Sequence, residues 1–266
     1  MKAMVTGGAG FIGAHLVREL LVRQHQVHVI DNLSTGSASK VDPGAILHIE
    51  DIRTSKAEEI IRATRPDVVF HLAAQADVQR SLKEPYTDSA INITGTTRIL
   101  EACRQGSVRK LVFSSTSAVY GELQKQRLDE EDVVDPISFY GMSKWSAERY
   151  IRLYWRLYGL PYTILRYANV YGPGQTAKGE GGVIALFMER LSKGLPLLIH
   201  GDGEQTRDFI YVRDVVEANL AAAELGDQQT IHVSTGQKTS INRITELLRE
   251  FHGEGVQVRY DSARTG

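Results

Sequence analysis

The sequence predicts an α/β fold: a doubly wound parallel sheet with a smaller, partly discontinuous C-terminal substrate lobe. Apolar segments rich in β-branched residues alternate along the chain with segments of helical spacing. The early strand segments are continuous hydrophobic runs, which is typical of strands buried on both faces. Strands that alternate with helices at this spacing pair in parallel through right-handed crossovers.

The predicted strands and helices follow one another in order. We expect strands at residues 2–6, 26–30, 46–50, 67–73, 110–115, 162–167, 197–200 and 230–235. We expect helices near residues 11–23, 54–64, 86–105, 138–158, 181–193, 212–225 and 240–252. The loops at 121–137 and 172–182 are long for such connections, and long loops in compact domains usually carry function.

The composition excludes several classes of protein. Of the 266 residues, 42 % are hydrophobic, and 31 Lys and Arg oppose 32 Asp and Glu, so no bulk basic surface exists for nucleic acid or a membrane. The one cysteine, Cys103, excludes an internal disulfide, and the eight histidines show no metal-ligand spacing, so we expect no metal. Neither a signal peptide nor an apolar run of about 18 residues occurs, so we expect a cytoplasmic protein.

A glycine-rich turn follows the first strand and opens the first helix. Residues 6–13 read TGGAGFIG, in which Gly7, Gly10 and Gly13 form a G-x-x-G-x-x-G array. The first glycine permits a tight turn, the second lets the backbone approach a pyrophosphate, and the third lets the helix pack against the strand. The N-terminus of the helix offers N–H groups to phosphates. The turn therefore predicts a Rossmann-type dinucleotide site.

An acidic residue stands where the adenosine ribose of such a dinucleotide is expected. Asp31 ends the second strand, 18 residues after Gly13, and an acid there accepts hydrogen bonds from ribose hydroxyls. The glycine turn upstream disfavours the alternative, a simple turn residue before Asn32. Because the carboxylate would repel a 2′-phosphate, we expect NAD rather than NADP.

A tyrosine and a lysine lie four residues apart at the start of a predicted helix. Tyr140 and Lys144 in YGMSK would share one helix face. A phenol is a poor base at neutral pH, because its ordinary pKa is about 10, but a neighbouring ammonium favours the phenolate. Thr116, in FSSTSAVYG, would lie just past the C-terminal end of a strand, where doubly wound folds place their ligands.

These motifs resemble those of the extended short-chain dehydrogenase/reductase family. TGGAGFIG, SSTSAVYG and YGMSK occur in the family's order, and the chain is most similar to the UDP-glucose 4-epimerases, also called UDP-galactose 4-epimerases. The resemblance runs from Met1 to Gly266. It includes DNLSTG at 31–36, HLAAQADV at 71–78, LRYANVYGPGQ at 165–175 and GDGEQTRDFIYVRD at 201–214.

The resemblance implies site residues position by position. For NAD these are Gly7, Gly10, Phe11, Ile12 and Gly13 at the pyrophosphate, Asp31 and Asn32 at the ribose, Asp51 and Ile52 at the adenine, and Ala73, Ala74, Gln75, Asn92, Tyr140 and Lys144 along the rest of the cofactor. The implied catalytic residues are Tyr140, Lys144 and Thr116. The implied substrate contacts are Thr116, Tyr140, Asn169, Arg207 and Arg264.

The implied reaction is NAD-dependent 4-epimerisation of a UDP-hexose through a transient 4-keto sugar, with Tyr140 as the base and acid. Related dehydratases carry an acid pair after the residue that matches Thr116, whereas this chain has Ser117 and Ala118, which disfavours dehydration. UDP-N-acetylglucosamine and UDP-glucuronate remain alternative substrates. A non-catalytic NAD-binding regulator is a further alternative, but such proteins commonly lose the tyrosine or the lysine.

The resemblance also implies an organisation for the whole chain. We expect residues 1–168 to form the NAD domain and 169–266 a nucleotide-sugar lobe with segments that return to the sheet. Family members extend beyond the DSARTG segment at 261–266, so we expect a truncated C-terminus. We also expect a homodimer through the helices at 86–105 and 138–158, which carry Tyr154, Trp155 and Tyr158. The alternative is that these aromatic side chains pack on the second lobe.

Overall fold

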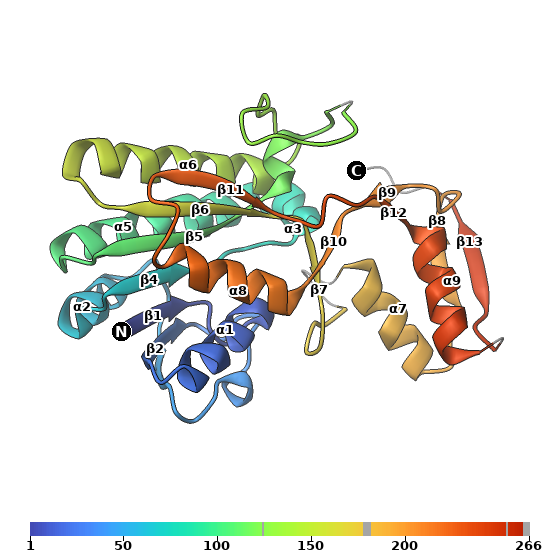
Figure 1. The fold of residues 1–266 in the computed structure, drawn as a ribbon, viewed down its shortest axis with the longest axis horizontal. Coiled ribbons are helices and arrows are strands. Elements are labelled where there is room, and N and C mark those ends of the chain that lie inside the picture. Colours follow the sequence, from blue (N-terminus) through green and yellow to red (C-terminus); the bar gives the residue numbers. More distant parts are fainter. Residues whose placement is uncertain (124, 178–181, 254, 263–266) are drawn as a thin grey trace. The chain divides into compact units, whose positions relative to one another are not determined.

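The chain folds into two compact units. The computed structural model describes residues 1–123, 125–177, 182–253 and 255–262, and Figure 1 shows the path of the chain. One unit consists of Met1–Tyr167 and Val212–Val233, and the other of Ala168–Tyr211 and Ser234–Gly266. The segment 212–233 thus returns to the first unit after the chain has entered the second.

The first unit is built on a parallel sheet, which confirms the predicted fold class. Among the described residues this sheet has seven strands in the order β11-β6-β5-β4-β1-β2-β3. The strands are β1 (Lys2–Thr6), β2 (Gln26–Asp31), β3 (Ile46–Ile49), β4 (Val68–His71), β5 (Lys110–Thr116), β6 (Tyr162–Tyr167) and β11 (Gln229–Val233). The chain order reverses between β1 and β4, and ligands of doubly wound folds bind at this switch point.

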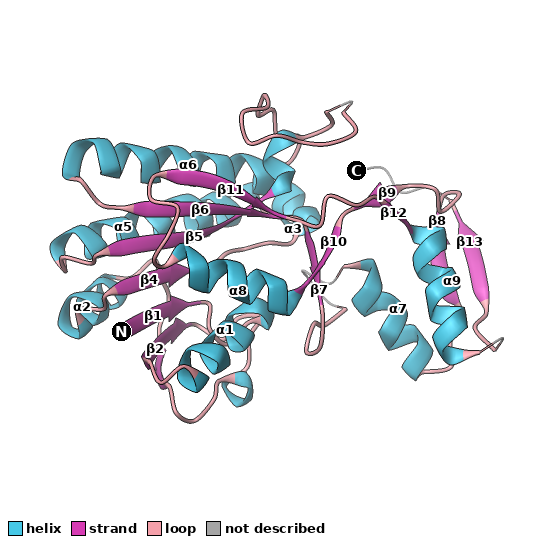
Figure 2. Cartoon of the chain, viewed as in Figure 1, coloured by secondary structure: helices cyan, strands magenta, loops and turns pink. Residues whose placement is uncertain are grey.

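Helices cover both faces of this sheet, as Figure 2 shows. On one face α1 (Phe11–Val22) packs against α8 (Val212–Ala222). On the other face α2 (Ser55–Thr64) packs against α5 (Thr96–Gln105), and α5 packs against α6 (Phe139–Tyr158). The shorter helices are α3 (Val78–Lys83), α4 (Pro85–Ser89) and the 3-10 turns η1 (Ala38–Lys40) and η3 (Ser117–Tyr120).

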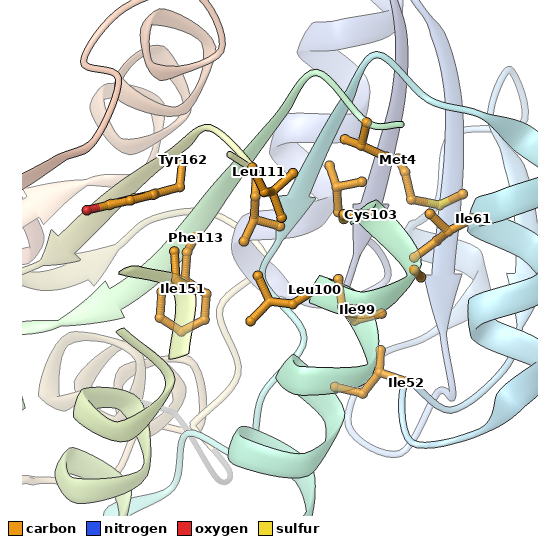
Figure 3. Packing of buried hydrophobic residues seen from close by; sticks show 14 of the residues in the cluster. Met4, Ile52, Ile61, Ile99, Leu100, Cys103, Leu111, Phe113, Ile151 and Tyr162 are labelled. Atoms are coloured by element: carbon orange, nitrogen blue, oxygen red, sulfur yellow. The ribbon is translucent and has the colours of Figure 1, made fainter. Parts of the chain in front are cut away.

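A continuous hydrophobic core lies between the sheet and α2, α5 and α6 (Figure 3). Met4, Leu111 and Phe113 from the strands meet Ile61 and Cys103 from the helices, and all five side chains are almost fully buried. Each such side chain adds roughly 1.5–3 kcal/mol of burial free energy. Burial also raises the pKa of the Cys103 thiol, as expected for an inert packing residue.

The predicted helix at 86–105 is interrupted in the structure. A π-helical segment, η2 (Ala90–Gly95), joins α4 to α5. Within it the Asn92 side chain bonds to the backbone of Gln75, which follows β4, and the Asn92 carbonyl accepts a hydrogen bond from Thr96. Such π segments recur at functional sites, and they have no signature in the hydrophobic pattern.

The second unit is a small lobe of paired short strands and helices. Its strands are β7 (Asn169–Tyr171) with β10 (Phe209–Tyr211), β9 (Thr206–Arg207) with β12 (Thr239–Ser240), and β8 (Leu197–His200) with β13 (Val258–Asp261). Its helices are α7 (Val183–Ser192) and α9 (Ile241–His252), which share a core that includes Phe187, Leu197 and Ile244. Strands of two or three residues show no periodicity, so several of them escaped prediction.

None of the helices in the described ranges combines the length and the apolar character that crossing a membrane requires.

Candidate active site

The glycine turn between β1 and α1 has a backbone that only glycine fits. Gly7 has a φ of +75°, and a Cβ there would lie 2.7 Å from the backbone nitrogen of Ala73. A Cβ on Gly13 would lie 2.1 Å from the Gly7 carbonyl oxygen. Gly10 caps α1 without a side-chain hydrogen bond, and the first turn carries no acid. The turn therefore presents backbone N–H groups to an anion, as a bound pyrophosphate requires.

Asp31 lies beside this turn at the end of β2. Asp31 as a residue is 8 % exposed, and its carboxylate accepts hydrogen bonds from the backbone N–H groups of Ala9 (2.9 Å) and Leu33 (2.8 Å). An ionised carboxylate offers about four acceptor positions, so about two remain for ribose hydroxyls. The geometry thus holds the carboxylate against the glycine turn and leaves it able to accept from a nucleotide.

The residues expected at the adenine lie on the neighbouring strand connection. The Asp51 carboxylate accepts hydrogen bonds from Asn32 Nδ2 (2.9 Å) and Arg53 Nη2 (2.8 Å). Chiefly through these Arg53 hydrogen bonds, the pKa of Asp51 is lowered to about 2. Ile52 is nearly buried and lies so close to Gly95 that a Cβ there would be 2.7 Å from its Cδ1. The structure therefore brings Asn32 and Asp51 together.

A cluster of buried polar side chains follows β4. The Asn92 side chain accepts from the Gln75 N–H (2.8 Å) and donates to the Gln75 carbonyl (2.9 Å) and to Ser143 Oγ (3.0 Å). Ser143 in turn donates to the carbonyl of Tyr140 (3.0 Å). Asp88, also buried, accepts from Gln75 Nε2 (2.9 Å). Asn92 thus ties the segment after β4 to the first turn of α6, and its amide already bonds to protein groups.

Thr116 and Tyr140 belong to elements that pack directly on each other. Thr116 ends β5 and caps the 3-10 turn η3, where its hydroxyl accepts from the Ala118 N–H (3.1 Å). Ser138 caps α6, and Tyr140 is half-buried in the first turn of that helix. A Cβ on Gly141 would lie 2.6 Å from the Ala118 carbonyl, so glycine is needed for this close approach.

Lys144 lies one helical turn after Tyr140 on the buried face of α6. Its side chain is 3 % exposed. Its ammonium nitrogen lies 4.5 Å from the centre of the Phe113 ring on β5, close enough for a cation–π interaction. The structure therefore holds the cation between α6 and the carboxyl-terminal half of β5, near the strand end that carries Thr116.

His71, at the end of β4, is fully buried in a chain of hydrogen bonds. The Thr96 hydroxyl donates to the Asn92 carbonyl (2.6 Å), so it accepts from His71 Nε2 (3.0 Å). His71 Nδ1 then accepts from the Thr6 hydroxyl (2.7 Å). Burial, and to a lesser extent the Lys144 cation, lowers the pKa of His71 to about 3. His71 is therefore a core histidine with both ring nitrogens hydrogen-bonded to protein groups.

Sequence reasoning missed several polar residues that support this region. They are Asp88 and Ser143, already described, and the buried ion pair of Glu148 with Arg166. One signal was available: Glu148 follows Lys144 by four residues and therefore continues the buried face of α6. Ser143, by contrast, lies in a motif without any local feature that separates it from an exposed serine.

The second unit carries the residues expected to bind the nucleotide diphosphate. Asn169 begins β7 and donates from Nδ2 to the Asp208 carbonyl (3.0 Å). Arg207, on β9 immediately before Asp208, is exposed, and within the described ranges its guanidinium forms no ion pair. Asn169 and Arg207 therefore lie near each other within this unit. Arg264, the third predicted contact, lies outside the described residues.

Comparison with known proteins gives this arrangement a family. The model of the NAD dependent epimerase/dehydratase family matches residues 3–234. The chain belongs to this family. The glycine turn, the held Asp31 carboxylate and the uncapped start of α1 fit the NAD that the family name prints. Among the residues that the structure describes, no three His, Cys, Asp or Glu side chains gather as metal ligands would.

Individual family members match nearly the whole chain. UDP-glucose 4-epimerase of Mycolicibacterium smegmatis is 40 % identical, over 100 % of this chain and 87 % of its own length. The crystal structure of UDP-glucose 4-epimerase from Thermotoga maritima with UDP-glucose is 43 % identical, with a TM-score of 0.97, and the match covers 100 % of this chain and 87 % of that one. UDP-N-acetylglucosamine 4-epimerase from Methanobrevibacter ruminantium, in complex with UDP-N-acetylmuramic acid, is 37 % identical with a TM-score of 0.95, over 100 % of this chain and 86 % of that one.

Proposed function

We propose that this protein catalyses NAD-dependent 4-epimerisation of a UDP-hexose, with UDP-glucose and UDP-galactose as the pair it interconverts. The observation that carries the proposal is the packing of α6, which carries Tyr140 and Lys144 one turn apart, on β5 and η3, where Thr116 ends the strand, in the unit that holds the glycine turn. Similarity to UDP-glucose 4-epimerases over the full chain supports the same activity.

In this proposal the side chains of the first unit move one proton. Tyr140, as the phenolate, takes the proton from the sugar 4-hydroxyl, beside or through the Thr116 hydroxyl, and later returns it. The Lys144 ammonium lowers the free energy needed to deprotonate Tyr140, because a nearby cation favours the phenolate. NAD held by the glycine turn and Asp31 would supply the hydride chemistry at C4 of the sugar. Ser143 and Asn92 hold the turn of α6 that carries Tyr140.

We assign NAD and the groups that act on the sugar 4-hydroxyl to the first unit, and the contacts to the diphosphate of the nucleotide sugar to the second unit. The glycine turn and Asp31 support NAD binding on the first unit, and the mutual hydrogen bonds of Gln75 and Asn92 support a role for these two residues at the far end of the NAD site. The exposed guanidinium of Arg207 donates to the Thr206 carbonyl (2.8 Å), forms no ion pair with any described residue, and lies close to Asn169, so it suits the diphosphate of the nucleotide sugar.

The experiment that tests the activity is product analysis by NMR. The purified protein is incubated with UDP-glucose, UDP-galactose and their N-acetyl forms, and inversion at C4 is followed. Formation of UDP-galactose from UDP-glucose is the expected result, and absence of C4 inversion with every substrate would refute the proposal. Inversion of only the N-acetyl sugars would favour the second candidate, a UDP-N-acetylglucosamine 4-epimerase, which the similarity to the Methanobrevibacter ruminantium enzyme supports. UDP-glucuronate, the other alternative substrate, is tested for C4 inversion in the same assay.

We also propose a homodimer through the faces of α5 and α6. Near the end of α6 the side chains of Leu153, Trp155, Leu157 and Tyr158 are 37–61 % exposed, an unusual density of apolar surface on one helix. Tyr154 behaves differently, because it is half-buried and packs against Tyr158 and the core. Light scattering should give a mass of about twice 29.5 kDa, and a monomer alone would contradict the dimer.

A further inference from the structure

The catalytic helix α6 carries a third polar side chain in line with Tyr140 and Lys144. Glu148 follows Lys144 by four residues, so the three side chains occupy one helix face. The Glu148 side chain is 0 % exposed, yet it has no part in the proton transfer described above. Burying a carboxylate is strongly unfavourable unless it is paired and hydrogen-bonded, so its presence needs an explanation.

Glu148 is bound to two strands of the sheet at once. Arg166, on β6 and 1 % exposed, donates from Nε to Oε1 (3.0 Å) and from Nη2 to Oε2 (2.7 Å), which makes a bidentate pair. Ser115, on β5, donates its hydroxyl to Oε1 (2.5 Å). Ser115 and Arg166 are direct partners in the β5–β6 register, and Ser115 immediately precedes Thr116. The carboxylate therefore connects α6 to the strand end that carries Thr116.

The same guanidinium also holds the chain that follows Thr116. Arg166 Nη1 donates to the Tyr120 hydroxyl, at the end of η3, and to the Glu130 carbonyl (3.2 Å) in the long loop. The Tyr120 hydroxyl contacts His232 Nε2 (2.5 Å) on β11, and the His232 N–H donates to the Glu130 carboxylate (2.7 Å). The Arg166 cation thus joins α6, η3 and the loop that carries Glu130, and its partner Glu148 adds the contact to β5 through Ser115.

Stability alone is a weak reason to keep such a pair. A buried ion pair often adds little net stability compared with well-packed apolar side chains, because desolvation offsets the attraction between the charges. A bidentate contact does fix orientation, since the planar guanidinium and the carboxylate allow one arrangement. The elements joined here are the ones whose mutual placement sets the distance from Thr116 to Tyr140.

We propose that Glu148 and Arg166 are positioning residues, whose ion pair fixes the first turns of α6 against the end of β5 and so aligns Tyr140 and Lys144 with Thr116. The proposal rests on the proposed epimerase function for its consequence in catalysis. Its structural content, the immobilisation of the start of α6, is independent of any activity.

The test replaces Glu148 by glutamine, which keeps the volume and loses the bidentate contact. We expect kcat for UDP-glucose to fall by tenfold or more, with KM and NAD content within about twofold of the wild type. Hydrogen exchange of the backbone at 139–148 and 116–121 should accelerate by at least tenfold, because these segments lose their tether. Ser115→Ala, which removes one hydrogen bond and fills no new space, should shift both quantities in the same direction by a smaller factor.

Lys110→Met provides a matched control at the other end of β5. Lys110 is 1 % exposed and pairs with Asp227 and the Leu225 carbonyl, far along the strand from Ser115. The Lys110→Met variant should have a lower melting temperature than the wild type, with unchanged kcat and unchanged backbone hydrogen exchange at 139–148. Equal loss of kcat in Lys110→Met and Glu148→Gln, or unchanged exchange at 139–148 in Glu148→Gln, would overturn the proposal. Wild-type protein without C4 inversion would refute the epimerase function, while the exchange data would still decide the positioning role.

Discussion

The buried histidine of β4 makes the stability of the first unit depend on pH in a calculable way. His71 holds its neutral form between two threonine hydroxyls, Thr6 and Thr96, and its pKa is lowered to about 3. In the unfolded chain a histidine has a pKa of about 6.5. Between these values the unfolded state binds one proton more than the folded state, so stability falls as the pH falls.

The size of the effect follows from the two pKa values. A pH of 5 is about 1.5 units below the pKa of a histidine in the unfolded chain, and each unit corresponds to about 1.4 kcal/mol of unfolding free energy. The folded His71 stays neutral at that pH, so the protein loses about 2 kcal/mol of unfolding free energy relative to pH 7. This contribution is fully present above about pH 6.5 and is lost progressively as the pH falls toward 3.

Urea denaturation of the wild type and of His71→Gln at pH 7 and pH 5 measures this difference. Glutamine offers a donor and an acceptor but does not ionise, so the variant is less stable at pH 7 and its deficit should shrink by about 2 kcal/mol at pH 5. His252→Gln serves as the control for the same chemical replacement at a position outside the core, because that side chain is exposed at the end of α9. A stability gap that stays constant between the two pH values would refute the reasoning.

The site supports three further predictions. Tyr140→Phe removes only the phenolic oxygen, so turnover should fall about 10²–10⁴-fold while NAD remains bound, and NMR rates near those of the wild type would show that another group is the base. Gly13→Ala places a Cβ 2.1 Å from the Gly7 carbonyl oxygen, so the free energy of unfolding should fall by about 1–3 kcal/mol and the affinity for NAD should fall as well. Unchanged NAD binding in calorimetry would contradict the role of the glycine turn. Arg207→Ala should weaken UDP binding about 10- to 100-fold without changing NAD binding, and equal loss of both would point to misfolding of the lobe instead.

Local sequence was sufficient for the sheet and for the motifs at its edge. The strands of the first unit have hydrophobic runs, and each candidate side chain at the sheet edge ends one of them or follows it within a few residues, as Asp31 ends β2 and Thr116 ends β5. Parallel pairing brings all those strand ends to one edge, so a linear pattern was enough to predict that these residues gather.

The buried polar contacts that support the site could not be predicted from the local sequence pattern. Asn92 lies in a π-helical segment and forms hydrogen bonds to Gln75 and Ser143. The spacing of hydrophobic residues does not predict a π-helical segment. Arg166 is the next-to-last residue of the fully buried strand β6, where a charged side chain conflicts with the local pattern. Its partner Glu148 lies on α6, 18 residues earlier in the sequence.

The sequence by itself therefore determined the fold class, the glycine turn and the Tyr140–Lys144 pair, because each depends on residues that are near neighbours along the chain. Only the tertiary structure decided which polar groups are buried together, such as His71 with Thr6 and Thr96. Hydrogen bonds inside the protein are strong and directional where water is absent, so they are specified by the meeting of distant segments and not by any local pattern.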